Sequence, residues 1–319
     1  MRATALASAI VGALLASLPV GNLSAAPAAA RKPAAPARRA SAAPVVRPGP
    51  QLPHRKTPYC GAISADAATG RVLFSDRANE EAYPASVTKL MTALLVLEDV
   101  EAGKYKLTDR ATATPDVNRC EASWVGIRVG ESMTVDDLLM ALLVNSANDA
   151  AIVLGVHSAG SLSAFVERMN AKAAALGMTK TRYFNANGLP APKYGKEFNR
   201  TTAADQLKLA LEVVRHPKIF KYTSTKIGEV KDGKGNPLRF VNHNNVMVKD
   251  KLKVINPDGK EAVDGLKTGY IDAGGSSVIL TGTRKGKRAI VVVLGSSSSS
   301  ERDDHARRLM EDALGALAW

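Results

Sequence analysis

The sequence is poor in the residue types that form metal centres and nucleic-acid interfaces. It has two cysteines, Cys60 and Cys120, without metal-ligand neighbours, and five histidines without clustered ligand spacing. The histidines are therefore predicted to be structural or exposed, not metal ligands or catalytic bases. Aromatic residues make up 5% of the chain, and no stacking motif is apparent. We expect no metal, no cofactor and no nucleic-acid partner.

No acidic residue occurs in residues 26–57, a stretch rich in Ala, Pro and Arg. This composition cannot bury a core and predicts a disordered basic linker. Together with Arg2, the stretch carries eight of the formal net charge of +13, which leaves +5 for the rest of the chain. A basic arm of this kind either associates weakly with anionic envelope polymers or lipid headgroups, or binds nothing.

A long membrane-spanning run is also missing at the N-terminus. Residues 1–25 contain Arg2, an apolar run to about Val20 and then small residues, which is the pattern of a cleavable export signal. The run is too short and too rich in alanine for a typical membrane span, and an uncleaved anchor is the alternative. Export predicts a periplasmic or extracellular protein and argues further against nucleic acid.

The export signal also bears on the two cysteines. In an oxidising compartment, Cys60 and Cys120 either form a disulfide or remain two separate buried thiols. A disulfide would stabilise the fold by up to roughly 4 kcal/mol in the chain-entropy model. The sequence leaves both possibilities open.

Residues 58–319 are long enough for one well-packed domain with two lobes. Strand patterns at both ends, with helices between them, predict an α+β fold in which the two ends share one antiparallel sheet. Helices at the N- and C-terminal ends would flank the sheet, the last one over about residues 300–318. A helical lobe would be inserted over about residues 80–215, with the functional site between the lobes.

Ser86 and Lys89 form a Ser-x-x-Lys motif at the start of a predicted helix. Apolar residues recur at helical spacing after Ser86, so this helix is expected to run to about Val100. The free N–H groups at its start favour negative charge, and Lys89 shares a face with the serine. Apolar neighbours would lower the pKa of Lys89 toward the range of a general base. Alone, the motif fits a capping serine and an exposed lysine better.

Ser146 and Asn148 form a Ser-x-Asn motif between two predicted helices. The first of these helices begins near Thr134, which is followed three residues later by Asp137. On a tight connection, Ser146 would relay a proton to a leaving amine, and Asn148 would orient Lys89 and bind a substrate carbonyl. Alone, serine and asparagine are ordinary capping and turn residues.

Lys267, Thr268 and Gly269 form a Lys-Thr-Gly motif on the first of three predicted antiparallel strands. The lysine and threonine would bind a substrate carboxylate, and the glycine would let the backbone approach the ligand. The N–H groups of Tyr270 and Ser86 would form an oxyanion hole. The alternative is a charged residue that protects an edge strand from pairing.

Taken together and in this order, the motifs resemble those of the penicillin-recognising serine enzymes. The sequence around the motifs is similar to that of low-molecular-weight D-alanyl-D-alanine carboxypeptidases, over about Tyr59 to the C-terminus. The segments that carry the likeness are 65–73, 84–92, 145–151, 184–190 and 264–270. The resemblance implies a β-lactamase/transpeptidase-like fold. Because no β-rich second domain or amphipathic tail follows the last helix, we expect a soluble single-domain enzyme.

The resemblance also assigns roles to the motif residues. It implies that Ser86 is the acyl-accepting nucleophile and Lys89 its base, and that Ser146 and Asn148 complete the proton network. The implied activity removes the terminal D-alanine from peptidoglycan stem peptides through an acyl-enzyme, in cell-wall biogenesis and the control of cell shape. β-Lactams would acylate the same serine.

The substrate carboxylate has its own set of implied partners. Lys267 and Thr268 would hold it, and some family members add an arginine just before the last helix. Arg302 is the residue nearest that position here, although residues 296–300 depart from the expected sequence.

Three alternatives remain open at this point. A DD-endopeptidase that cleaves peptidoglycan crosslinks would use the same residues. A serine β-lactamase would need a deacylating carboxylate, usually in a Glu-x-x-Leu-Asn segment, and residues 167–170 fail in spacing. A non-catalytic wall-binding module would be tethered through the basic linker, but the intact motifs argue against it.

Overall fold

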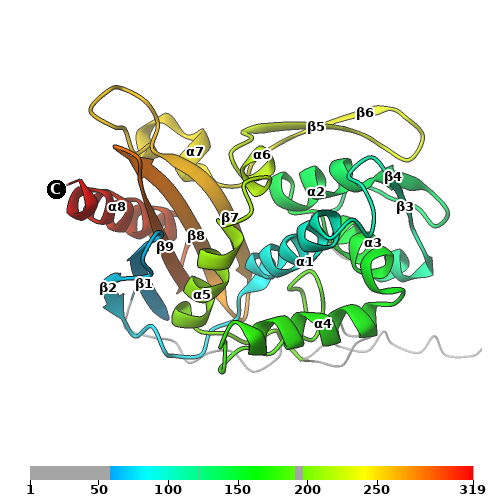
Figure 1. Cartoon of the computed structure of the whole chain (residues 1–319), viewed down its shortest axis with the longest axis horizontal. Coiled ribbons are helices and arrows are strands. Elements are labelled where there is room, and N and C mark those ends of the chain that lie inside the picture. Colours follow the sequence, from blue (N-terminus) through cyan, green and yellow to red (C-terminus); the bar gives the residue numbers. More distant parts are fainter. Residues whose placement is uncertain (1–57, 121, 191–196, 319) are drawn as a thin grey trace, which may run out of the picture. The chain divides into compact units, whose positions relative to one another are not determined.

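The computed structural model describes residues 58–120, 122–190 and 197–318 (Figure 1). The expected export signal in residues 1–25 and the expected linker in residues 26–57 lie outside the described residues. A helix before the first strand would also fall outside them.

One five-stranded antiparallel sheet joins the two ends of the domain. Its strands lie in the order β2, β1, β9, β8, β7. Their bounds are Gly61–Asp66 for β1, Val72–Asp76 for β2, Val263–Ile271 for β7, Gly275–Arg284 for β8 and Lys287–Ser296 for β9. β1 pairs with β9, so the prediction that both ends share one sheet is confirmed. β7, which carries the third motif, is an edge strand.

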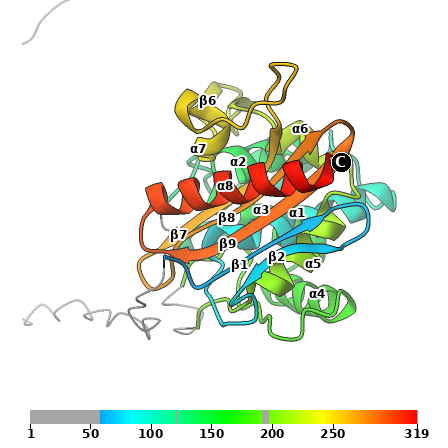
Figure 2. The same ribbon diagram turned by 90° about the vertical axis from the view of Figure 1, so that its left-hand side faces the viewer.

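Strand β9 is buried on both faces because helices cover the sheet from two sides. Ile290 and Val292 point into the core shared with the inserted helices, whereas Val291 and Val293 pack against α8 (Ser299–Leu317). Successive side chains of a strand alternate between faces, so one continuous apolar run serves both cores. Figure 2 shows α8 lying along one face of the sheet.

The inserted helical lobe is built from two long and several shorter helices. Their bounds are Lys89–Glu101 for α1, Val135–Val144 for α2, Asn148–Ala159 for α3, Leu162–Ala175 for α4, Ala203–Val213 for α5 and Ile219–Thr223 for α6. The short elements are η1 (Ala85–Thr88), β3 (Arg110–Thr112), η2 (Pro115–Arg119), β4 (Ser132–Thr134), β5 (Ile227–Lys231), β6 (Pro237–Val241), α7 (Asn245–Val248) and η4 (Asp250–Leu252). The expected helical insertion is confirmed, but it does not end near residue 215, because α6, β5, β6, α7 and η4 also precede β7.

Local signals explain where two of these helices begin. The predicted start of the first helix, Ser86, lies in the 3₁₀ turn η1, and α1 continues directly from it at Lys89. α2 is capped by Thr134, whose hydroxyl oxygen accepts a hydrogen bond from the N–H of Asp137 at 3.0 Å. Both helix starts therefore agree with the sequence patterns.

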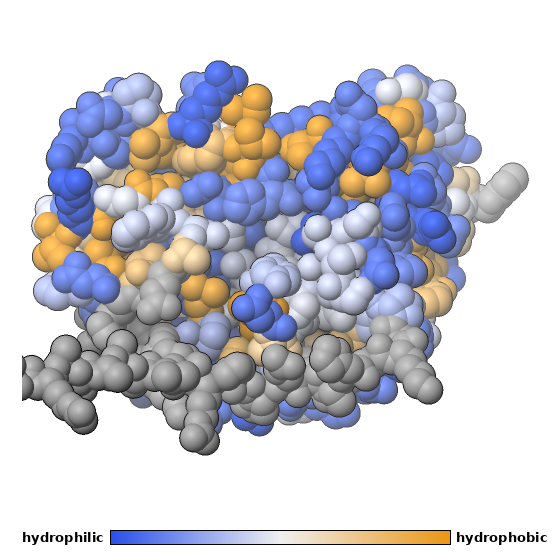
Figure 3. All heavy atoms as spheres, turned by 180° about the vertical axis from the view of Figure 1, so that it is seen from behind, coloured by the Kyte–Doolittle hydropathy of each residue, from blue (hydrophilic) through white to orange (hydrophobic). Residues whose placement is uncertain are grey.

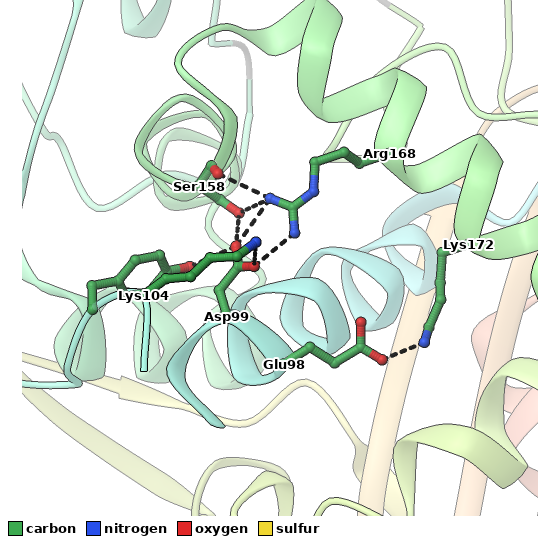
Figure 4. A network of polar contacts seen from close by, with 7 residues as sticks. Glu98, Asp99, Lys104, Ser158, Arg168 and Lys172 are labelled. Carbon is green, nitrogen blue, oxygen red and sulfur yellow. Dashed lines mark hydrogen bonds and ion pairs between the residues drawn. The ribbon is translucent and has the colours of Figure 1, made fainter. Parts of the chain in front are cut away.

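Buried polar contacts tie the C-terminal end of α1 to α3 and α4 (Figure 4). The carboxylate of Asp99, 2% exposed, accepts hydrogen bonds from Arg168 at 2.8 and 2.9 Å and from the hydroxyl of Ser158 at 2.5 Å. Lys104 forms an ion pair with the same carboxylate. Burial favours the neutral acid, but the hydrogen bonds from these partners outweigh it and lower the pKa of Asp99 to about 2.

The two cysteines, both within the described part of the chain, are not joined by a disulfide. Cys60 is buried just before β1, and Cys120 is partly exposed just after η2. Of the two possibilities left open by the sequence, separate thiols are what the structure contains, with only Cys60 fully buried.

Membrane-spanning potential can be assessed only for the described ranges. No single helix there is long and apolar enough to cross a membrane. Helices α3 and α4 meet the criteria of length and composition as a pair, but the chain bends by 85° between them.

Candidate active site

Ser86 and Lys89 are joined by a direct hydrogen bond. Lys89 Nζ lies 2.9 Å from Ser86 Oγ and donates a second hydrogen bond to the carbonyl oxygen of Asn187 at 2.8 Å. The next residue, Gly188, passes so close to η1 that a Cβ atom would lie 1.8 Å from the carbonyl oxygen of Ala85. Only glycine permits this approach, which explains why Asn-Gly stands at this point of the sequence.

The surroundings of Lys89 disfavour its charged form. The residue is 0% exposed. Burial, followed by repulsion from Lys267, holds the pKa of Lys89 well below its usual range, although Cys120 and Asp149 act in the opposite direction. A neutral amine at hydrogen-bond distance from a hydroxyl can accept its proton, so the pair can generate a nucleophilic serine.

Ser146 and Asn148 lie on the tight connection between α2 and α3, as the sequence predicts. Ser146, 3% exposed, adopts a left-handed backbone conformation with φ of 61°. Asn148 begins α3, and its side-chain amide donates to the carbonyl oxygen of Ala122 at 2.7 Å. The connection is therefore held in a conformation that few residues adopt without outside support.

The Lys-Thr-Gly motif lies on the edge strand β7, beside η1. Lys267 is 2% exposed and donates to the carbonyl oxygen of Thr268 at 3.0 Å. Burial and the neighbouring Arg302 lower the pKa of Lys267 to about 7. A Cβ atom at Gly269 would lie 2.7 Å from the carbonyl oxygen of Pro84 and 3.0 Å from the backbone nitrogen of Ser86. The glycine thus permits close packing of β7 against the serine's own backbone.

Tyr270 and Arg302, the other two predicted substrate-binding residues, differ in solvent exposure. The Tyr270 side chain is 59% exposed and its hydroxyl donates to Asp272, which leaves only its backbone for the predicted role. Arg302, in the first turn of α8, is 5% exposed and donates to one carboxylate oxygen of Asp303 from Nε at 2.8 Å and from Nη2 at 2.6 Å. The position chosen for the arginine is therefore a buried one at the cleft.

One cleft of about 790 Å³ brings the three motifs together. The predicted site residues that line it are Ser86, Ser146, Asn148, Thr268, Gly269, Tyr270 and Arg302. Lys89 and Lys267 are buried and bonded to groups of the first and third motifs. Figure 3 shows hydrophilic and hydrophobic residues interspersed over one face of the molecule.

Sequence reasoning missed two contributors to this cleft. His243 lines it, and partial removal from water within the cleft, followed by the positive charges of Lys267, Lys89 and Arg302, lowers its pKa to about 4. The second contributor is the backbone carbonyl of Asn187, which accepts a hydrogen bond from Lys89, a residue 98 positions earlier in the sequence. The available signals were the family-like segment 184–190 and its Asn-Gly pair at 187–188, which mark an unusual turn but do not identify its partner.

A group of possible metal ligands lies outside this cleft. Glu98, Glu212 and His216 place ligand atoms within 4.8 Å of one another in the described structure. Glu98 forms an ion pair with Lys172, and His216 Nδ1 lies 2.7 Å from a carboxylate oxygen of Glu101. Glu98 and His216 are therefore already engaged by other side chains of the protein.

The fold and the cleft define the class to which the chain belongs, that of the active-serine acyl-transfer proteins. The family model of Peptidase S11, described as D-alanyl-D-alanine carboxypeptidase, matches residues 58–298, and the chain belongs to this family.

Individual relatives agree with the family. The chain is 32% identical to the D-alanyl-D-alanine carboxypeptidase DacF of Bacillus subtilis over 254 residues, which cover 79% of this chain and 61% of the relative. It is 29% identical to the D-alanyl-D-alanine endopeptidase of Escherichia coli over 222 residues, 69% of this chain and 65% of the relative. The chain thus spans less than two thirds of the length of these curated relatives.

A solved structure gives the same result for the fold. Penicillin-binding protein D2 from Listeria monocytogenes, in its ampicillin-bound form, superposes with a TM-score of 0.68 at 29% identity. The match covers 82% of this chain and 99% of that protein. The expected β-lactamase/transpeptidase-like α+β fold is confirmed.

Proposed function

We propose that the protein is a serine-type D-Ala-D-Ala carboxypeptidase that removes the terminal D-alanine from peptidoglycan stem peptides. Neutral Lys89 accepts the hydroxyl proton of Ser86 as its oxygen attacks the carbonyl carbon of the penultimate D-alanine. The negative charge on the carbonyl oxygen is stabilised by the backbone N–H groups of Ser86 and Tyr270.

Collapse of the tetrahedral intermediate breaks the peptide bond. The proton held by Lys89 passes through Ser146 to the leaving nitrogen, so D-alanine departs with a neutral or protonated amine. Asn148 orients the lysine and binds a carbonyl of the stem peptide. Water then attacks the ester on Ser86, Lys89 again takes the proton, and the shortened peptide and free serine result.

The substrate carboxylate is held at the other side of the cleft. Lys267, Thr268 and Arg302 provide two cations and a hydroxyl near the position that a terminal carboxylate would occupy. Because an anion favours the protonated form of Lys267, substrate binding would raise a pKa that burial and Arg302 had lowered. This requirement selects peptides that end in a free carboxylate and explains recognition of β-lactams, which carry a comparable group.

The observation that carries the proposal is the 2.9 Å contact between Ser86 Oγ and a fully buried lysine. An exposed lysine would be protonated and could not act as a base at neutral pH. The experiment is release of D-alanine from a stem pentapeptide by wild type and by Ser86→Ala. Release by wild type alone supports the proposal, and undiminished release by the variant contradicts it.

A DD-endopeptidase activity is the second candidate, because the D-alanyl-D-alanine endopeptidase of Escherichia coli is 29% identical over 69% of this chain. The same serine and lysine would cleave a crosslink whose acyl donor ends at D-alanine. Parallel assays of a pentapeptide and a crosslinked dimer separate the activities. Faster cleavage of the dimer would reverse the present order of preference.

We further propose that the enzyme acts on the cell wall outside the cytoplasm. The division into an export signal at 1–25, a basic linker at 26–57 and a catalytic domain at 58–319 supports this location. Weak association of the linker with anionic envelope polymers belongs to the same proposal. Removing residues 26–57 from the mature protein should then weaken its sedimentation with isolated cell walls, with catalysis on soluble peptide unchanged.

A further inference from the structure

Residues 122–127 form a loop beside the connection that carries Ser146 and Asn148. Ala122 and Ser123 line the cleft, and their backbones adopt φ values of 51° and 39°, a region that favours glycine. Neither residue is a glycine, so the loop needs contacts from outside itself to keep this shape.

The carboxylate of Asp149 supplies such contacts. Its Oδ2 atom accepts hydrogen bonds from the N–H groups of Val125 at 3.0 Å, Gly126 at 2.9 Å and Ile127 at 3.0 Å. Its Oδ1 atom accepts the N–H of Ala150 at 2.9 Å. Asp149 is 0% exposed, so no bulk water competes for these donors. Three consecutive N–H groups of the loop therefore converge on one carboxylate.

Two backbone carbonyl groups of the same loop accept hydrogen bonds from Asn148, the residue before Asp149. The carbonyl oxygen of Ala122 accepts the side-chain amide of Asn148 at 2.7 Å, and that of Ser123 accepts the backbone N–H of Asn148, also at 2.7 Å. Asp149 therefore binds residues 125–127 of the loop, and residues 122 and 123 bind Asn148. The loop is thus hydrogen-bonded at both ends to the start of α3, beside the Ser-x-Asn motif.

We propose that Asp149 is a positioning residue, which shapes the 122–127 loop and through it orients Asn148 and Ser146 toward the acylated serine. The inference rests on the proposed function, because it concerns the proton network of that reaction. Ser86 and Lys89 lie on η1 and α1 and do not contact this loop through the bonds described above. Loss of Asp149 should therefore disturb one half of the site and leave the other in place.

The negative charge of Asp149 should have a second measurable effect, on the pH dependence of acylation. Burial and Lys267 lower the pKa of Lys89, whereas Cys120, beside the loop, and Asp149, on α3, raise it. Removing the carboxylate charge should lower the pKa of Lys89 further. Since the neutral lysine is the active form, the acid limb of the acylation rate should then move to lower pH. Neutralising a buried aspartate that exerts no such effect on Lys89, such as Asp205, would not produce this displacement.

The test compares Asp149→Asn with Asp205→Asn in the full chain. Asp205 is the matched control, because it is also a buried aspartate in the first turn of a helix and accepts a backbone N–H, that of Lys180, at 2.8 Å. Hydrogen exchange at residues 125–127 reports the loop. The rate of acylation by benzylpenicillin between pH 5 and 9 reports the site.

For Asp149→Asn we expect exchange at residues 125–127 to become at least about tenfold faster, because an amide cannot accept at both of its former oxygen positions. Acylation should slow by about 10- to 100-fold, with its acid limb displaced to lower pH. Asp205→Asn should change neither quantity. Wild-type exchange with slowed acylation, or faster exchange with a wild-type acylation rate and pH profile, would overturn the proposal.

A second variant covers the case in which Asp149→Asn does not fold. Gly126→Ala strains the loop at φ of 84°, where the added Cβ atom meets only open space, so the carboxylate and the core remain as they are. It should also slow acylation, and an unchanged rate would contradict the proposal. If wild type itself is not acylated, the proposed function fails, while the exchange data still decide whether Asp149 holds the loop.

Discussion

Helix α1 carries a buried ionisable residue near each end, and the two residues differ in which protonation state their surroundings favour. Lys89 at its start faces another lysine, so burial and repulsion together favour the neutral amine. Asp99 near its end faces Arg168 and Lys104, so the carboxylate remains charged in spite of burial (Figure 4). One helix therefore presents an amine that favours its neutral form at the cleft and a fixed ion cluster at its far end.

Burial acts against the charged form at both ends, and the neighbouring groups then add to that effect at Lys89 and oppose it at Asp99. A like-charged neighbour adds to the cost of burying a charge and lowers the pKa of a buried amine further. Such an amine can take up a proton and release it again near neutral pH, which suits catalysis. An oppositely charged neighbour opposes the cost of burial, and the group then contributes to stability instead. The comparison predicts that variants at the Lys89 end change rates and that variants at the Asp99 end change stability.

The largest effect is expected for Lys89→Met. The methionine fills a similar volume but cannot accept the proton of Ser86, so acylation by benzylpenicillin should fall by about 10²- to 10⁴-fold. Quenched-flow kinetics with intact-mass detection measures the rate, and circular dichroism checks that the variant is folded. Acylation within threefold of wild type would show that another group is the base.

Lys267→Met should have the next largest effect, through the substrate carboxylate. Loss of a charged hydrogen bond of about 1.5–3 kcal/mol lowers kcat/KM for a pentapeptide by about 10- to 100-fold. A pentapeptide that ends in an amide is the matched control substrate, and its already low kcat/KM should change little. Equal losses for the two substrates would place Lys267 outside carboxylate recognition.

Asp99→Asn should lower the free energy of unfolding by about 2 kcal/mol at pH 7, with kcat unchanged. The folded-state pKa of about 2 lies below the usual value of 3.8, so the carboxylate stabilises the fold above about pH 4. That contribution is lost as the pH falls through 2, where wild type and variant should converge. Urea titrations at several pH values measure it, and a pH-independent difference would contradict the charge argument.

The smallest effect expected is a change of KM with pH. Lys267 has a pKa lowered to about 7, and only its protonated form attracts the substrate carboxylate. KM for the pentapeptide should therefore rise between pH 7 and 9, by no more than about tenfold in all. Steady-state kinetics between pH 6 and 9 checks this. A constant KM would mean that Lys267 stays protonated throughout.

Local patterns were sufficient to predict the elements that carry the three motifs. Apolar spacing after Ser86 predicted α1, Thr134 and Asp137 predicted the start of α2, and two β-rich runs predicted β8 and β9. These signals act within a few residues of their own position. The resemblance then joined the motifs into one site, and Arg302, chosen as the residue nearest the start of the last helix, lines the cleft from the first turn of α8.

Contacts between distant segments could not be predicted in the same way. The carbonyl of Asn187 binds Lys89, and the carbonyl of Ala122 binds Asn148, but a backbone carbonyl leaves no trace in residue type. Gly269 was predicted to let the backbone approach a ligand and does line the cleft, but its close packing against the backbone of Pro84 and Ser86 was not foreseen. Asp149 stood beside a motif, yet its partners are N–H groups more than twenty residues away.

The central claim is that Ser86 forms an acyl-enzyme at this cleft. Intact mass of the purified mature protein after brief exposure to benzylpenicillin tests it most directly, with Ser86→Ala alongside. We predict a persistent adduct of one equivalent on wild type and none on the variant. No adduct together with no loss of penicillin, or an adduct of equal size on Ser86→Ala, would contradict the account, and rapid loss of penicillin without an adduct would indicate a β-lactamase.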